Sequence, residues 1–264
     1  MNLIHQLQEN PVNFLIGVLY SMPAVLIALT LHELSHGYVA LKCGDPTAKM
    51  LGRLSFNPLR HLNLFGTLCM LFFGVGWANP VPVNPRNYKH FKRDDILVSV
   101  AGIVTNLLLY VFCVFTSCVI IRIMFPGELF EKEMGSFFLK NGGVGYYVLQ
   151  MGQENVSIDV FTVLGAKHMW LQYVLRFLSV FGTCNLSLAL FNLLPIPPLD
   201  GYRLMNNVLF RHRIRIPQKI MQFVIIGVLV LNYATGWIGT VITYVMNGAQ
   251  SAVLFILLPL FGMM

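Results

Sequence analysis

Two histidines and a glutamate lie within five consecutive residues of a strongly apolar part of the chain. Residues 32–36 have the sequence H-E-L-S-H. Histidines four positions apart lie on one face of a helix, so their imidazoles can bind a single metal ion. Glu33 lies beside the first histidine, where it can take a proton from metal-bound water. Ionisable residues are costly to bury in an apolar helix, so the pattern predicts a functional metal site.

One acidic residue stands out in the second half of the chain. Asp200 is the only acidic residue between Lys167 and the C-terminus, and three prolines precede it within residues 195–198. Such a stretch cannot form a regular helix, and a membrane tolerates its unpaired backbone groups only beside a cavity. Two imidazoles and one carboxylate would leave a fourth tetrahedral position for water, which is usual for catalytic zinc. Asp200 is therefore the candidate third ligand of one Zn²⁺ per chain; the alternative is a helix N-cap.

The elements that must position these residues are membrane helices. The chain has 264 residues, of which 56% are hydrophobic and only 11% are charged. Soluble domains are roughly a quarter charged. The net charge of +7 comes from basic loops between apolar runs, where it sets orientation and does not indicate nucleic-acid binding. The five cysteines form no C-x-x-C pair and are interpreted as small buried hydrophobic residues.

Four apolar runs predict membrane-spanning helices, at residues 14–41, 96–125, 169–194 and 220–245. A further run, at 64–75, is too short for an ordinary span and lies between two basic loops. It predicts a re-entrant or β-hairpin-like membrane segment near 64–84, with a helix on the membrane surface as the alternative. We expect an all-α polytopic membrane protein with about four to six transmembrane helices. It forms a single domain over residues 1–264, with a core at 14–210 and C-terminal helices at 217–264.

The loop charges predict where the site lies in the membrane. Three loops are rich in lysine and arginine, which places them in the cytoplasm; they lie at residues 42–63, 86–93 and 203–219. The connection at 126–167 has few basic residues and is expected on the outer side. The first and third predicted spans then both run from outside to inside. The histidine pair and Asp200 should therefore meet near the cytoplasmic face, in a bacterial plasma membrane.

In combination, these motifs resemble the site-2 protease family of intramembrane zinc metalloproteases. H-E-L-S-H is followed far downstream by N-L-L-P-I-P-P-L-D-G at residues 192–201. The similarity extends through residues 44–48, 76–84 and 101–106 and covers most of 14–210. The resemblance is to a compact subgroup that lacks PDZ and CBS domains.

The resemblance implies roles for five residues. By it, His32, His36 and Asp200 match the zinc ligands and Glu33 matches the catalytic glutamate. Asn192 matches an asparagine that supports the substrate carbonyl or oxyanion. Many relatives carry G-P-x-x-N where residues 102–106 of this chain have G-I-V-T-N, so no role is carried over to Asn106. The small residue and the amide of this stretch could serve close packing or a site, and close packing is the preferred interpretation.

The family's activity implies hydrolysis of peptide bonds within or near transmembrane segments of membrane-anchored proteins. The partners would then be such a substrate and the lipid bilayer, with no nucleic acid. Intramembrane histidine and carboxylate groups also occur in metal or proton transporters, which is one alternative. Transporters often show paired repeat halves, and none is visible in this sequence. A pseudoprotease that binds membrane helices without cutting them is the other alternative.

Overall fold

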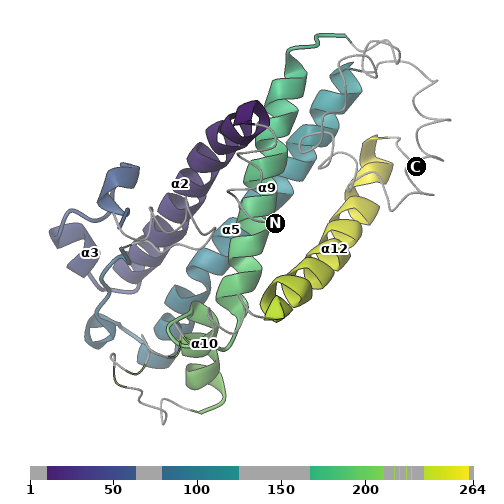
Figure 1. Cartoon of the computed structure of the whole chain (residues 1–264). Helices are drawn as coiled ribbons and strands as arrows, with labels where there is room; N and C mark the ends of the chain where they lie inside the picture. Colours follow the sequence, from purple (N-terminus) through teal and green to yellow (C-terminus); the bar gives the residue numbers. More distant parts are fainter. Residues whose placement is uncertain are drawn as a thin grey trace. The chain divides into compact units, whose positions relative to one another are not determined.

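The part of the chain that the structure describes consists of helices and the loops that join them. The computed structural model describes residues 11–63, 79–124, 167–210 and 235–261, with isolated positions at 217, 220, 224 and 227. All regular structure among these residues is helical (Figure 1). Four helices are long and apolar enough to cross a membrane: α2 (Pro11–Lys42), α5 (Phe91–Met124), α9 (Leu171–Leu193) and α12 (Trp237–Leu257). The expectation of an all-α polytopic membrane protein is confirmed.

The chain divides into two compact units, which are described separately. The first consists of Met1–Leu107 and Leu188–Ile238, and the second of Leu108–Ser187 and Gly239–Met264. The first unit contains H-E-L-S-H and Asp200, and so holds all the predicted site residues. The expectation of a single membrane-embedded domain stays a prediction.

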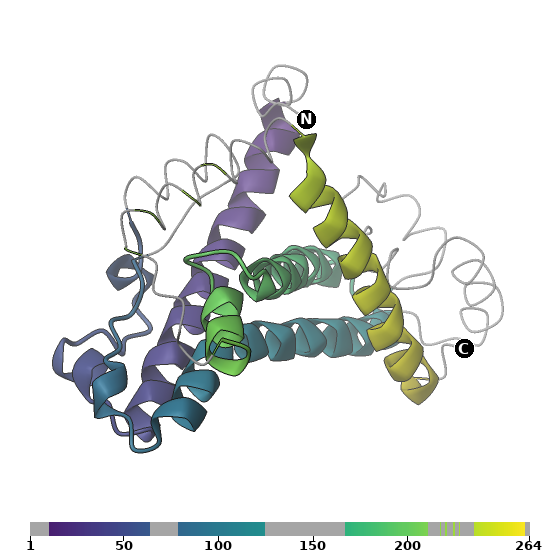
Figure 2. The same ribbon diagram turned by 90° about the horizontal axis from the view of Figure 1, so that it is seen from below.

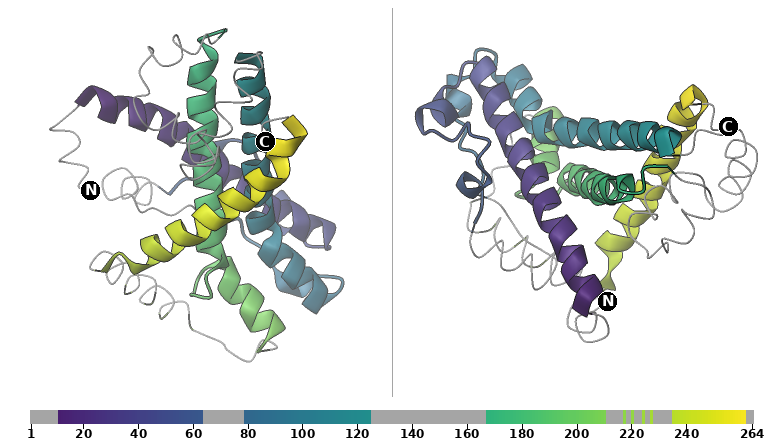
Figure 3. Two further views of the ribbon diagram at one scale, coloured as in Figure 1. Left: turned by 90° about the vertical axis from the view of Figure 1, so that its right-hand side faces the viewer. Right: turned by 90° about the horizontal axis from the view of Figure 1, so that it is seen from above.

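In the first unit, the C-terminal part of α2 packs against the first turns of α5. Ala40 and Cys43 form a buried cluster with Tyr88 and Val98, and the crossing of the two helices can be followed in Figures 2 and 3. Burial raises the pKa of the Tyr88 hydroxyl to about 12, so this group remains neutral in the cluster. On another face of α2, Gly37 permits the close approach of the segment before η2: a Cβ there would lie 2.8 Å from the Val81 side chain.

A buried carboxylate fixes the loop that follows α2. Asp45 accepts hydrogen bonds from the Thr47 hydroxyl, from the Asn84 N–H at 2.6 Å and from the Asn87 amide at 2.8 Å. Burial alone would raise the pKa of this carboxyl, but these hydrogen bonds outweigh burial and hold the pKa below its usual range. Asp45 therefore joins the start of α3 (Thr47–Met50) to the start of η2 (Pro85–Asn87).

Helix α10 (Asp200–Val208) is attached to the first turns of α5 by a second buried carboxylate. Asp95 is 4% exposed. It accepts hydrogen bonds from the Arg203 guanidinium at 2.9 Å and from the Asn207 amide at 3.0 Å. The Asn207 amide also lies 3.3 Å from the carbonyl oxygen of Lys92. An ion pair and the hydrogen bonds of a side-chain amide thus fix the position of α10 against α5.

The second unit buries a tyrosine and two cysteines of α5, and a glycine of α9 lies close to them. Tyr110, Cys113 and Cys118 are buried, and a Cβ at Gly182 would lie 3.2 Å from the Cβ of Cys113. The described cysteines are free, and three of the four are buried. This agrees with their interpretation as small hydrophobic residues; Cys69 lies outside the described residues.

The boundary of the fourth predicted span was wrong. We expected it to end at Val245, but α12 continues to Leu257 and is followed by the turn η4 (Leu258–Phe261). The polar residues after Val245 do not break the helix; the hydroxyl of Ser251 donates to the Asn247 carbonyl within it. The predicted re-entrant run at 64–75 and most of the 126–167 connection lie outside the described residues.

Candidate metal centre

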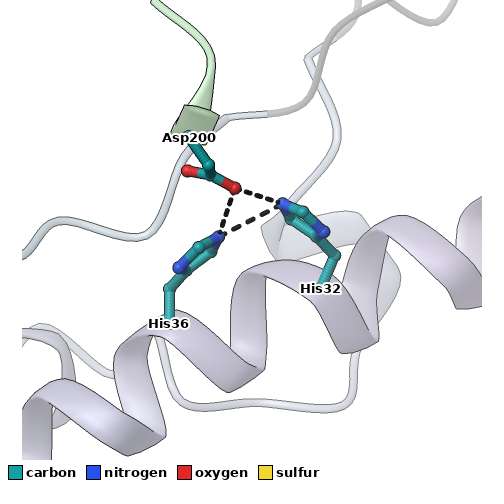
Figure 4. A group of neighbouring side chains, drawn as sticks. All are labelled: His32, His36 and Asp200. Carbon is teal, nitrogen blue, oxygen red and sulfur yellow. Dashed lines mark hydrogen bonds and ion pairs between the residues drawn. The ribbon is translucent and has the colours of Figure 1, made fainter. Parts of the chain in front are cut away.

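Three side chains from distant parts of the sequence meet in the first unit. Nε2 of His32 and Nε2 of His36 lie 3.2 Å apart, and each lies close to the same carboxylate oxygen of Asp200, at 3.2 Å and 3.1 Å (Figure 4). The two histidines are 4% and 7% exposed. The sequence predicted this meeting of two imidazoles and a carboxylate.

The two histidines are positioned by the regularity of α2 and by α5 behind it. Their rings lie edge to face with centroids 4.8 Å apart, as expected one helical turn from each other. Nδ1 of His36 lies 2.6 Å from the carbonyl oxygen of Val98. Nδ1 of His32 lies 3.2 Å from the amide nitrogen of Asn106. Each imidazole is thus held at its Nδ1 by α5 and presents its Nε2 to Asp200.

Asp200 reaches the histidines from the first residue of α10. Leu199 is the N-cap of that helix, and no side-chain cap bond is present there, so the alternative of Asp200 as a cap is wrong. Gly201 lies so close to the end of α9 that a Cβ on it would be 2.2 Å from the carbonyl oxygen of Leu193. The absence of a side chain at Gly201 allows the chain to turn sharply after the prolines. Burial would raise the pKa of the Asp200 carboxyl, but the imidazoles of His32 and His36 beside it hold that pKa below its usual range.

Glu33 is held by a backbone amide. Its Oε2 accepts a hydrogen bond from the Val81 N–H at 2.9 Å. The segment around Val81 is tied down on both sides. The Arg53 guanidinium donates to the carbonyl of Asn79 at 2.8 Å, and the Asn84 N–H donates to Asp45. The carboxylate that the sequence singled out as a base is therefore oriented by a fixed, extended segment.

The geometry of the three ligands fits a zinc ion. Ligands about 2.0–2.1 Å from zinc in a tetrahedral set lie about 3.3 Å from one another. The three distances between His32, His36 and Asp200 are 3.1 to 3.2 Å. Nitrogen and carboxylate donors in this combination are typical of catalytic zinc sites. The residues can hold the metal with only small side-chain adjustments.

Three contributors to the site escaped the sequence analysis because they act across helices or through the backbone. Asn106 contacts His32, although packing was the preferred interpretation of its stretch. Gly102 leaves room for the imidazole, since a Cβ there would lie 2.4 Å from the His32 ring. The Val98 carbonyl holds His36, and the residue type does not reveal such a role.

Asn192 is placed near the end of α9. Its amide donates a hydrogen bond to the carbonyl of Leu188, one turn earlier in the same helix, at 3.0 Å. The role that the resemblance implies for it stays a prediction.

Comparisons with known proteins agree with the site. The model of peptidase family M50 matches residues 20–234. The chain is 37% identical over 189 residues to a protein of Bacillus subtilis (strain 168) named "Putative zinc metalloprotease YwhC"; the match covers 72% of this chain and 68% of the relative. No solved structure matches the chain.

The family match identifies the class of the protein as a metalloprotease, and the four long apolar helices that the structure describes agree with a membrane protein. The chain belongs to peptidase family M50, the family of site-2 proteases.

Proposed function

We propose that the protein is an intramembrane zinc protease that hydrolyses peptide bonds within or near transmembrane segments of membrane-anchored proteins. The observation that carries the proposal is the convergence of His32, His36 and Asp200 onto one point in the family of site-2 proteases. Three buried or half-buried ionisable groups among apolar helices are costly without a function.

Each residue has a distinct role in this proposal. His32, His36 and Asp200 hold the metal. When bound, zinc supplies a Lewis acid that makes water more acidic and polarises a peptide carbonyl. Glu33 is the general base: because its Oε2 is held by the Val81 N–H, its Oε1 takes the proton and later delivers it to the leaving amine.

Asn192 would act on the substrate. One N–H of its amide donates to Leu188, and the second N–H of the same amide could donate to a substrate carbonyl. A donor aimed at the oxygen on which charge develops contributes most in a low-dielectric site. We therefore assign Asn192 the stabilisation of the oxyanion.

The substrate and the location follow from the membrane setting. The family implies a membrane-anchored protein as substrate. Basic residues flank the membrane helices close to the site, including Lys42 at the end of α2 and Arg93 at the start of α5. This supports a site near the cytoplasmic face of a bacterial plasma membrane.

The test is substitution of the proposed base. Wild type and Glu33→Gln would be purified, analysed for metal, and mixed in lipid vesicles with a tagged single-span membrane protein. We expect about one zinc per chain in both proteins and a loss of about 10²- to 10⁴-fold in cleavage for Glu33→Gln, because only the base is removed.

A control separates this result from loss of the metal. His36→Ala should lose zinc and cleavage together, since it removes a ligand. Full cleavage by Glu33→Gln would remove the assigned base. Zinc flux across the vesicles without cleavage by wild type would favour a transporter, and zinc binding with neither flux nor cleavage would favour a pseudoprotease.

A further inference from the structure

Asn106 is a fully buried amide on α5 that lies directly behind one of the proposed zinc ligands. We propose that it is a positioning residue: in the zinc-bound protein its side-chain oxygen accepts a hydrogen bond from Nδ1–H of His32. This bond fixes the tautomer in which Nε2 of His32 binds the metal. The inference rests on the proposed function, because it requires zinc to be bound by Nε2.

The neighbouring histidine shows what such a partner does. Nδ1 of His36 lies 2.6 Å from the Val98 carbonyl oxygen. A carbonyl oxygen can only accept, so Nδ1 of His36 carries the proton and its Nε2 is free to bind a cation. Metal-binding histidines usually have such an acceptor on the other ring nitrogen.

Nδ1 of His32 faces a side-chain amide of α5, whereas Nδ1 of His36 faces a backbone carbonyl of α5. α5 runs antiparallel to α2 at this point, so that Val98 lies opposite His36 and Asn106 lies opposite His32. In the present arrangement the Asn106 NH₂ faces Nδ1 of His32 at 3.2 Å, while the Asn106 Oδ1 is buried without a partner among the described residues. With this orientation Nδ1 accepts, and the proton lies on Nε2, which faces Asp200 at 3.2 Å.

Binding of zinc at Nε2 reverses that requirement. The neutral ring must then carry its proton on Nδ1, and Nδ1 becomes a donor. Rotation of the amide by half a turn places Oδ1 at Nδ1 in the same volume, because the two ends of an amide are nearly equal in size. An asparagine thus serves the ring both with and without the metal, because its amide offers a donor at one end and an acceptor at the other. Gly102, one turn before Asn106, leaves the ring room to hold its plane.

The experiment compares two isosteric substitutions by their zinc affinity. Zinc dissociation constants would be measured by chelator competition for wild type, Asn106→Leu and Asn106→Asp. Leucine removes the acceptor, so we expect affinity to fall 10- to 100-fold, the usual effect of losing such a partner. Aspartate keeps an acceptor, so its affinity should stay within about threefold of wild type.

A purely structural role predicts the opposite order. A buried leucine would be tolerated and a buried carboxylate would not. The matched control is Asn185→Leu, since Asn185 is also fully buried but donates to Phe181 of its own helix, in the second unit. That variant should bind zinc like wild type. Wild-type affinity in Asn106→Leu, or equal losses in the leucine and aspartate variants, would overturn the inference.

A second measurement needs no variant. ¹⁵N NMR of histidine-labelled, zinc-loaded wild type should show Nδ1 of His32 protonated and Nε2 bound to metal. A His32 ring bound through Nδ1 would overturn the inference while leaving the proposed function intact. If wild type bound no zinc, both the inference and the proposed function would be overturned. The zinc dissociation constant of wild type shows whether this is so.

Discussion

The two sides of the metal centre are built in different ways. On the histidine side, the helical repeat of α2 places His32 and His36 one turn apart, so the spacing of two candidate ligands is fixed by local structure. On the carboxylate side, Asp200 begins a short helix after an irregular turn. Its position depends on contacts with α5 and with the end of α9. The spacing of the two histidines along the chain is therefore set by local structure, whereas the position of Asp200 depends on tertiary packing alone.

Gly201→Ala is the sharpest way to break the carboxylate side alone. The added Cβ would lie 2.2 Å from the Leu193 carbonyl oxygen and 2.6 Å from that of Leu194. Both are backbone atoms, so the turn must open and carry Asp200 away from the histidines. We expect zinc affinity to fall by more than about 100-fold, on the order of losing a ligand partner or more, as measured by chelator competition.

The control for that change is a glycine with open surroundings. Gly248 lies in α12, and a Cβ there meets nothing within 4 Å. Gly248→Ala should bind zinc like wild type and gain slightly in thermal stability, because alanine favours helix. If Gly201→Ala kept its zinc, the carboxylate side would not depend on this turn.

Removal of the ion pair between α5 and α10 should have a smaller effect. Asp95→Ala leaves the Arg203 guanidinium and the Asn207 amide without this partner. Hydrogen bonds to charged groups contribute about 1.5–3 kcal/mol each, and Arg203 is partly exposed, so we expect a loss of about 2 kcal/mol in unfolding free energy. Because α10 carries Asp200, zinc affinity should fall by roughly 10-fold, equivalent to about 1.4 kcal/mol.

The adjacent carboxylate provides a matched control. Asp94 accepts from the His90 N–H at 2.8 Å and pairs with the exposed Arg93, on the same element. Asp94→Ala should therefore lower thermal stability without lowering zinc affinity. Equal zinc affinities in the Asp95 and Asp94 variants would show that α10 is held in place by other contacts.

The same division explains what could be predicted from the sequence. His32, Glu33 and His36 were predicted because a spacing of four residues is a local property of a helix. Asp200 was supported by its isolation and by the family resemblance. Asn106 and the backbone groups of Val81 and Val98 were missed. Their contacts join residues 48 to 74 positions apart, and backbone groups carry no signal in residue type.

The membrane helices were predicted for a similar reason. The first span was expected at 14–41 and occupies Phe14–Lys42, and the third was expected at 169–194 and occupies Leu171–Leu193. Length and apolar content determine such segments locally. The fourth span was expected at 220–245, but α12 runs from Trp237 to Leu257; a helix satisfies its own backbone groups, so the polar residues after Val245 do not end it.

The smallest predicted effect concerns Asp45, which brings tertiary packing to the histidine side. Asp45 holds the segment between Val81 and η2, and the Val81 N–H in turn binds Glu33, but Asp45 contacts no candidate zinc ligand.

The pKa of the Asp45 carboxyl lies below the usual value, so its carboxylate stabilises the folded protein fully above about pH 4. That contribution is lost as the pH falls through the lowered pKa. The thermal midpoints of metal-free wild type and Asp45→Asn should therefore differ at neutral pH and converge in acid. The other titrating groups are the same in both proteins, so their effects cancel when the two midpoints are subtracted. A gap that stayed constant down to pH 3 would contradict this role for the carboxylate. Zinc affinity should be equal in the two proteins at neutral pH, since the histidine ligands are held by α2 and α5 alone.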